Sequence, residues 1–227
     1  MKLLHPEYPL EMIFEENYVQ RLVIESPKIM AEFVLDFKNQ IAKKEGRWIL
    51  SQDGKVLNIS DVCEFIIDIF DVEINQRKSI GILYDALEKE INESELFIKW
   101  REILASIESV LNCAIDNMDY DICYQEMDIK QLFKSIDIQF KKDSDNYVEN
   151  LLQYMELMSE IRKIKIFILL NASSFLTVDE LKYLYEQSFY KKYNLLLIDS
   201  QDMKIFSEVE QKIIIDKDAC VIDINMK

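Results

Sequence analysis

Clustered carboxylates between residues 116 and 128 are the side chains in this sequence best suited to binding a metal ion. The acidic residues are Asp116, Asp119, Asp121, Glu126 and Asp128. Hard cations take oxygen ligands, so calcium is the chemically sensible occupant. However, the spacing is not that of an EF-hand loop, which needs a glycine at its turn and a bidentate glutamate at its twelfth position. Composition alone therefore favours a solvated acidic loop, with calcium binding as the alternative.

Two loops that follow apolar runs are the default places for a ligand in an α/β protein. They span residues 171–174 and 199–202. Neither contains a glycine-rich phosphate cradle, a nucleophile with a nearby base, or metal ligands at a familiar spacing. An earlier loop, residues 25–28, lies where an ATPase would bind phosphate, but it reads Glu-Ser-Pro-Lys and not G-x-x-x-x-G-K-[ST]. An NTP-dependent enzyme would have only Lys28 to hold phosphate there, so we predict no catalytic activity.

The thiols and the single histidine do not form a recognisable site. The four cysteines contain no CxxC pair, and His5 is far from all of them in sequence, so we expect reduced thiols. Glutamates occupy the first residues where a secretory signal would need an apolar core, and no apolar run approaches the roughly 20 residues of a membrane span. These features predict a cytoplasmic protein.

The overall charge argues against binding of nucleic acid by most of the protein surface. The chain has 42 acidic and 27 basic residues, a formal net charge of -15. Such a surface repels phosphates, unless a local basic face lies within an acidic assembly. An acidic protein-binding module, or one that mimics nucleic acid, is therefore an alternative that the charge itself suggests.

A strand, a helix and a second strand organise the C-terminal part of the chain. Apolar runs at residues 164–170 and 195–198 flank Thr177-Val178-Asp179-Glu180, which can form a capping box and begin a helix. Apolar runs without polar alternation are typical of strands covered on both faces, as in parallel sheets. The fold class is therefore predicted to be α/β.

The remaining elements follow from local patterns. We predict strands at 10–14 and 19–24, a helix over 28–44, a hairpin turning at Asp53-Gly54, a helix at about 60–69 and a strand at 136–140. Between residues 79 and 117 two long apolar stripes recur at helical spacing. These two helices either project as a subdomain or simply cover the sheet.

Three C-terminal segments carry a family resemblance. They read FILLNASSFLTVDE at 167–180, LLLID at 195–199 and IIDKDACVI at 214–222. Their succession of apolar strand, small-residue loop, Leu-Thr-x-Asp-Glu, second strand and late Asp-x-Asp resembles the Csn-two family of CRISPR-associated spacer-acquisition proteins of type II-A systems. The order and length of the elements also agree along nearly the whole chain.

The resemblance implies both a fold and a function. The fold is an α/β head domain (residues 1–78 and 136–227) with a mostly parallel sheet resembling a degenerate P-loop fold, plus an inserted α-helical leg subdomain (residues 79–135). The function is non-enzymatic, sequence-independent binding of double-stranded DNA ends through the central channel of a homotetrameric ring that needs calcium. The ring supports spacer acquisition, the adaptation step of antiviral CRISPR defence. Its implied partners are the integrase proteins and the Cas-nine effector nuclease of the same locus, and no membrane is involved.

A lysine-rich channel wall would resolve the conflict with the acidic charge, because a tetramer repeats a modest basic face four times. The candidate DNA-binding residues are Lys38, Lys43, Lys44, Arg47, Lys55, Arg77, Lys78, Lys134, Lys141 and Lys142. For calcium, the resemblance implies the ligands Asp116, Asp119, Asp121 and Glu126, next to a short insertion at residues 121–123.

Overall fold

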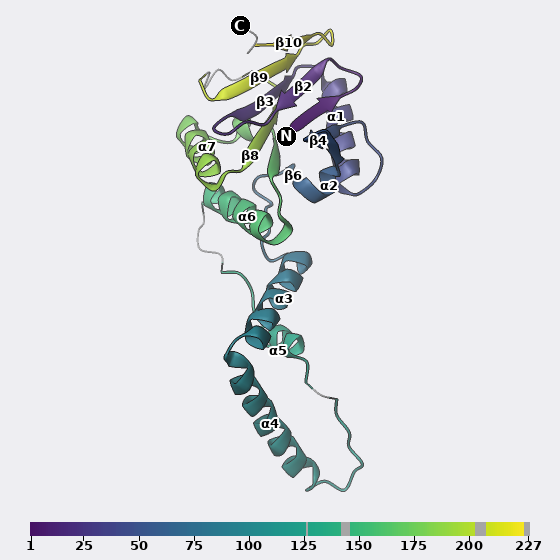
Figure 1. Cartoon of the computed structure of the whole chain (residues 1–227), viewed down its shortest axis with the longest axis vertical. Coiled ribbons are helices and arrows are strands. Elements are labelled where there is room, and N and C mark those ends of the chain that lie inside the picture. Colours follow the sequence, from purple (N-terminus) through teal and green to yellow (C-terminus); the bar gives the residue numbers. More distant parts are fainter. Residues whose placement is uncertain (126, 142–145, 203–207, 225–227) are drawn as a thin grey trace. The chain divides into compact units, whose positions relative to one another are not determined.

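The chain folds into two compact units. The computed structural model describes residues 1–125, 127–141, 146–202 and 208–224. Unit 1 comprises Met1–Val72 and Asp143–Lys227, and unit 2 comprises Glu73–Lys142 (Figure 1). The predicted insertion, residues 79–135, lies inside unit 2. Each unit is described by itself below.

Unit 1 is built on a six-stranded sheet, as Figure 1 shows. Its strands are β3 (Val19–Ile24), β6 (Cys63–Ile66), β7 (Ile166–Leu170), β8 (Asn194–Asp199), β9 (Glu210–Ile215) and β10 (Val221–Asp223). They lie in the order β10-β9-β3-β8-β7-β6, and every pair except β9 with β10 is parallel. This confirms the predicted α/β class with a mostly parallel sheet. Since β3 leads through a short loop into α1 (Pro27–Ile41), the unit has the strand–loop–helix opening of a P-loop fold.

A second, antiparallel sheet lies in the same unit. It has the order β2-β1-β4-β5, formed by β1 (Lys2–His5), β2 (Leu10–Ile13), β4 (Ile49–Gln52) and β5 (Lys55–Leu57). The predicted hairpin joins β4 to β5, with φ of 51° at Asp53 and 75° at Gly54. Two consecutive positive φ angles are those of a type I′ turn, which explains the Asp-Gly pair.

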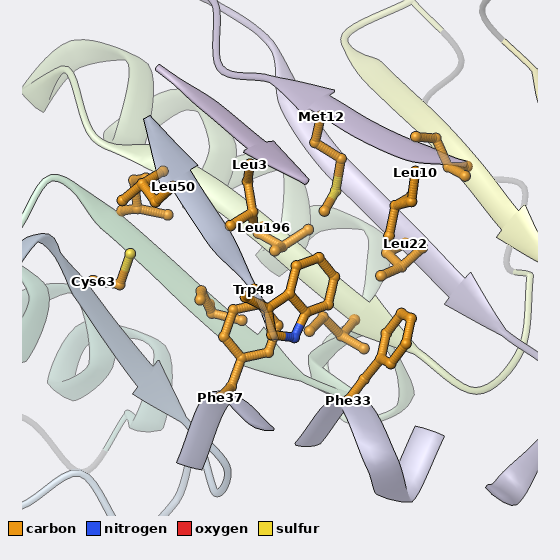
Figure 2. Packing of buried hydrophobic residues seen from close by; sticks show 14 of the residues in the cluster. Leu3, Leu10, Met12, Leu22, Phe33, Phe37, Trp48, Leu50, Cys63 and Leu196 are labelled. Carbon is orange, nitrogen blue, oxygen red and sulfur yellow. The ribbon is translucent and has the colours of Figure 1, made fainter. Parts of the chain in front are cut away.

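The main core lies between α1, the small sheet and one face of the large sheet. Trp48 stacks on Phe37 with ring centroids 4.4 Å apart and meets Phe33 edge-on at 4.9 Å. Figure 2 shows these rings among side chains from both sheets, including Leu3 and Met12 of the small sheet and Leu22 and Leu196 of the large one. Burial of this apolar surface is what joins the two sheets into one unit.

The other face of the large sheet is also covered. On β7 and β8 the alternate residues Phe167, Leu169, Leu195 and Leu197 are fully buried, like the core residues between them. The helices α6 (Tyr147–Arg162) and α7 (Val178–Lys191) supply buried side chains of their own. Burial on both faces explains why these strands show no polar alternation in the sequence.

The predicted capping box at the start of α7 is present. The Thr177 hydroxyl accepts a hydrogen bond from the backbone N–H of Glu180, and the Glu180 carboxylate accepts one from the backbone N–H of Thr177. Replacing Thr177 with alanine should lower the free energy of unfolding by about 1 kcal/mol, because one N–H of the first turn loses its acceptor. Urea denaturation would measure this loss. Thr177→Ser, which keeps the acceptor, is the matched control and should remain near wild type.

The described residues of unit 2 form the helices α3 (Arg77–Glu93), α4 (Leu96–Ile115) and α5 (Ile129–Ser135). Tyr84 of α3 packs against Phe133 of α5 with ring centroids 5.7 Å apart. The Asn75 side chain exchanges two hydrogen bonds with the backbone of Phe140, at 2.9 and 3.0 Å. These bonds join the two ends of the unit. Within the described residues, no helix has the length and apolar character needed to span a membrane.

Two predictions of secondary structure are wrong. The helix predicted at residues 60–69 is a four-residue helix, α2 (Ile59–Val62), followed by the edge strand β6. Parallel pairing of β6 with β7 decides this, since a short apolar run fits either period. The strand predicted at 136–140 is irregular: Ile136 ends α5, and Asp137 has a positive φ of 52°. It has no strand to pair with among the described residues.

Candidate nucleic-acid interface

Four of the predicted DNA-binding lysines lie in unit 1 around the end of α1. Lys38 lies in the last turn of α1, Lys43 and Lys44 follow the helix, and Lys55 begins β5; all four are exposed. Lys43 and Lys44 line a pocket of about 340 Å³ together with Val56 and Leu57 of the hairpin. The structure therefore brings the loop after α1 and the β4–β5 hairpin to one surface.

The loop that carries Lys43 and Lys44 is held at both ends. The Gln40 side chain accepts a hydrogen bond from the backbone N–H of Trp48 at 3.2 Å and donates one to the Trp48 carbonyl at 2.8 Å. Gly46 lies so close to Gln40 that an added Cβ would come within 2.5 Å of its Cγ. A side chain at position 46 would have to displace the Gln40 side chain, which makes the two hydrogen bonds to Trp48.

Lys43 has an acidic neighbour, but the pair is loose. Its Nζ lies 3.8 Å from Asp61 Oδ1, and the side chains are 76% and 56% exposed. Exposed pairs at this distance contribute little and are screened by salt. The ammonium group is therefore available to exchange Asp61 for a phosphate.

Arg47, also predicted to contact DNA, lies within a group of carboxylates. Its guanidinium donates to Asp36 at 2.7 Å, pairs with Glu7, and lies 3.8 Å from Glu32. The hydrogen bond to Asp36 is the main reason that the pKa of Arg47 is raised. Its charge serves to tie the loop before β4 to α1.

The other predicted basic residues belong to unit 2. Arg77 is the first residue of α3, Lys134 lies in α5, and both are exposed. Lys141 is exposed and has an interaction partner. The side chain of Lys78 and the whole of Lys142 lie outside the described residues.

The predicted calcium ligands follow the end of α4. Asp116 caps this helix, Asp119 and Asp121 lie in the irregular segment after it, and all three are exposed. Glu126 lies outside the described residues. Carboxylate oxygens suit Ca²⁺, but in the part of the chain that is described, no three acidic, histidine or cysteine residues form a group that could hold a metal ion. Calcium binding stays a prediction.

The loops at the carboxyl ends of β7 and β8 are occupied by a buried polar network. Asp199, the last residue of β8, accepts hydrogen bonds on Oδ2 from Arg21 Nε of β3 at 3.1 Å and from the Ser173 hydroxyl at 2.8 Å. Arg21 also donates to both carboxylate oxygens of Glu210 at 3.2 Å, and the Tyr185 hydroxyl donates to Glu210 at 2.9 Å. All five side chains are buried. We call them the Arg21 network.

Within the Arg21 network, burial affects the ionisation of Asp199. Burial raises the pKa of Asp199, because loss of water destabilises the carboxylate more than Arg21 and Ser173 stabilise it. The carboxylate at the end of β8 is thus used to connect β3, β8 and the turn Ala172–Ser174. The sequence analysis missed Arg21 and Glu210. A single arginine within the otherwise mostly apolar strand of residues 19–24 is the feature of the sequence that could have indicated a buried ion pair.

The loop between β3 and α1 lacks the glycines of a phosphate-binding loop. The N–H of Glu25 donates to the carbonyl of Ile215 at 2.9 Å, and Pro27, which has no N–H, stands at the first turn of α1. A phosphate cradle needs several free N–H groups and glycines that allow close approach. This loop contains no glycine, and two of its residues have no N–H to offer to a ligand.

Comparisons with known proteins give a consistent result. A family model described as CRISPR-associated protein (Cas_Csn2) matches residues 40–219. A protein of Enterococcus faecalis named CRISPR-associated protein Csn2 is 22% identical over 143 residues, 60% of this chain and 63% of that protein. The match thus spans slightly less than two thirds of the Enterococcus protein. A protein of the same name from Streptococcus agalactiae is 22% identical over 162 residues, 71% of this chain and 72% of that protein.

A solved structure was also matched. The ADP conformation of an ATP-binding cassette from an ABC transporter has a TM-score of 0.47 and 10% identity, covering 94% of this chain and 82% of that one.

Proposed function

The chain belongs to the Csn2 family of CRISPR-associated proteins, and we propose that it binds the ends of double-stranded DNA, independently of sequence, through the central channel of a homotetrameric ring. In this proposal it catalyses no reaction and supports spacer acquisition, the adaptation step of type II-A immunity. Family membership confirms the resemblance found in the sequence and establishes a CRISPR-associated role.

One observation carries the DNA-binding proposal. On a chain with a net charge of -15, Lys38, Lys43, Lys44 and Lys55 are exposed on two neighbouring segments of unit 1, and the ion pair between Lys43 and Asp61 is loose. Flexible lysines suit phosphate contacts, which fix position without reading sequence. Fourfold repetition in a ring would turn this small group into a basic lining.

The absence of catalysis is proposed from groups that are otherwise engaged. The Asp199 carboxylate accepts from Arg21 and Ser173, and the loop after β3 directs the Glu25 N–H to Ile215. A nucleotide-hydrolysing site would need a free aspartate for Mg²⁺ and free N–H groups for phosphate. Asp199 Oδ2 and the Glu25 N–H are already engaged within the protein, which supports a role without catalysis.

Calcium, the partners and the location belong to the same proposal. Asp116, Asp119, Asp121 and Glu126 would supply carboxylate ligands for Ca²⁺ that stabilises the ring. The integrase proteins and the Cas9 effector nuclease of the locus would be the protein partners, and the protein would act in the cytoplasm.

The mass in solution, measured by light scattering with calcium and then with chelator, tests the proposal together with a gel shift. We expect a tetramer in calcium that dissociates or loosens in chelator. It should shift linear duplex DNA and leave closed circular DNA unbound, because a closed circle has no end to enter a channel. A monomer that is indifferent to calcium and binds neither DNA would contradict the ring. An acidic protein-binding module would then be the better description.

A further inference from the structure

The ring of Phe70 contacts two other aromatic rings on the surface of unit 1. Phe70 follows β6, Phe175 follows β7, and Tyr147 begins α6. The ring centroid of Phe70 lies 5.2 Å from that of Tyr147 and 5.3 Å from that of Phe175. They therefore form a continuous group assembled from three segments at the carboxyl edge of the sheet. We call it the aromatic patch.

The rings of the aromatic patch are not core residues. Phe70 is 55% exposed and Phe175 is 52% exposed. Two further large apolar side chains nearby in sequence, Ile67 and Val178, are 45% and 52% exposed. Single exposed apolar residues are ordinary on a protein surface, but contacting aromatic rings with exposed aliphatic neighbours are typical of an interaction surface.

Acidic groups are built into the aromatic patch. The Asp68 carboxylate accepts a hydrogen bond from the backbone N–H of Phe70 at 2.8 Å. The Tyr147 hydroxyl donates to Glu180 Oε1 at 2.8 Å, and this bond helps to lower the pKa of Glu180, after the backbone and side-chain bonds from Thr177. The Glu180 carboxylate is thus held in its charged form beside the rings.

The two chain segments that carry the phenylalanines add only negative charge. Neither residues 56–76 nor residues 166–181 contain a lysine or arginine. Asp71 and Asp179, within these segments, are exposed. A partner that buries the rings must therefore approach a negative rim.

We propose that the aromatic patch docks a partner protein through a basic segment that carries an aromatic or aliphatic anchor. The anchor would pack on Phe70 and Phe175, and lysine or arginine side chains would meet Asp68, Asp71 and Glu180. DNA is a poor occupant because its phosphates would face these carboxylates. A second copy is disfavoured at this surface because the acidic rims of the two copies would face each other. The choice of probes rests on the proposed function, whereas the surface itself does not.

The experiment uses the double variant Phe70→Ser/Phe175→Ser in the full chain. Its binding to the purified integrase proteins and to the effector nuclease of the same locus is measured by biolayer interferometry, beside wild type. We expect wild type to bind at least one of them and the variant to bind it about tenfold or more weakly, since central aromatic anchors dominate interface energies. Asp71→Lys should weaken the same complex and reduce its dependence on salt.

Controls separate docking from folding and from DNA binding. Tyr190→Ser removes a ring that is 80% exposed on α7, and it should leave partner binding unchanged. The double variant should keep the thermal midpoint, the tetramer mass and the gel shift of linear DNA. If wild type does not shift linear DNA in the gel, the proposed DNA-binding function is rejected. That result would not affect the proposal that the aromatic patch docks a partner protein.

The docking proposal is overturned by any of three results. If wild type binds neither the integrase proteins nor the effector nuclease, the proposed partner is excluded. Equal binding by wild type and by the double variant would show that the partner contacts another surface of the protein. A changed mass of the double variant in light scattering would show that the aromatic patch is an interface between copies of this chain.

Discussion

Replacing Arg21 with leucine is expected to lower the free energy of unfolding by about 3–5 kcal/mol, the range found when one partner of a buried ion pair is removed. Arg21 is fully buried, and its guanidinium faces Asp199 at 3.1 Å and Glu210 at 3.2 Å. Without it, two carboxylates would remain in the interior without a compensating charge. Urea denaturation monitored by circular dichroism would measure the loss.

A compensated variant distinguishes charge burial from loss of packing. Arg21→Met combined with Asp199→Asn and Glu210→Gln keeps similar volumes, and the amide oxygen introduced by Glu210→Gln can still accept from Tyr185. Because no charge remains buried, this triple variant should recover a large part of the lost stability. A leucine variant that loses less than about 1 kcal/mol would show that the Arg21 network is stabilised in some other way.

The leucine variant should also show a characteristic pH dependence. Burial already raises the pKa of Asp199 in the folded protein, and loss of the guanidinium should raise it further. A carboxyl with a folded pKa above its unfolded value binds more protons when folded, so stability falls as pH rises between the two values. The gap between wild type and Arg21→Leu should therefore be smaller at mildly acidic pH than at pH 8. An equal gap at both pH values would argue against an uncompensated buried charge as the cause.

Reversing the charge of the lysines around the end of α1 is expected to abolish the binding of linear DNA at physiological salt. The variant carries Lys38→Glu, Lys43→Glu, Lys44→Glu and Lys55→Glu. Each phosphate contact contributes about 0.9 to the slope of log affinity against log salt concentration. If each lysine contacts one phosphate in every protomer that engages the DNA, the slope of wild type should be steep. Neutral substitutions at the same positions should flatten it by about 0.9 for each contact removed.

The matched control reverses four other exposed lysines of unit 1: Lys28, Lys182, Lys192 and Lys217. It has the same net charge as the test variant, so general repulsion between the chain and DNA is equal in both. Fluorescence anisotropy of a labelled duplex over a range of salt concentrations would compare them. Equal loss in the two variants would mean that net charge, and not a local basic surface, governs binding.

The sequence determined those features that depend on neighbours along the chain. The capping box of Thr177 and Glu180, the Asp53-Gly54 turn and the buried strands β7 and β8 follow from hydrogen bonds, φ preferences and periods that extend over only a few residues. The two long helices α3 and α4 were predictable for the same reason. The residues of three C-terminal segments resembled the family, and the family match confirmed that resemblance.

Tertiary structure decided the features that join distant segments. The residues after Val62 form strand β6 because β7 lies beside them, whereas their apolar spacing also fits a helix. Arg21 is 178 residues from Asp199 and 189 residues from Glu210, and the rings of the aromatic patch come from three segments. No local period encodes such contacts. A charge loses its water, and a group of rings forms on the surface, only after the chain has folded.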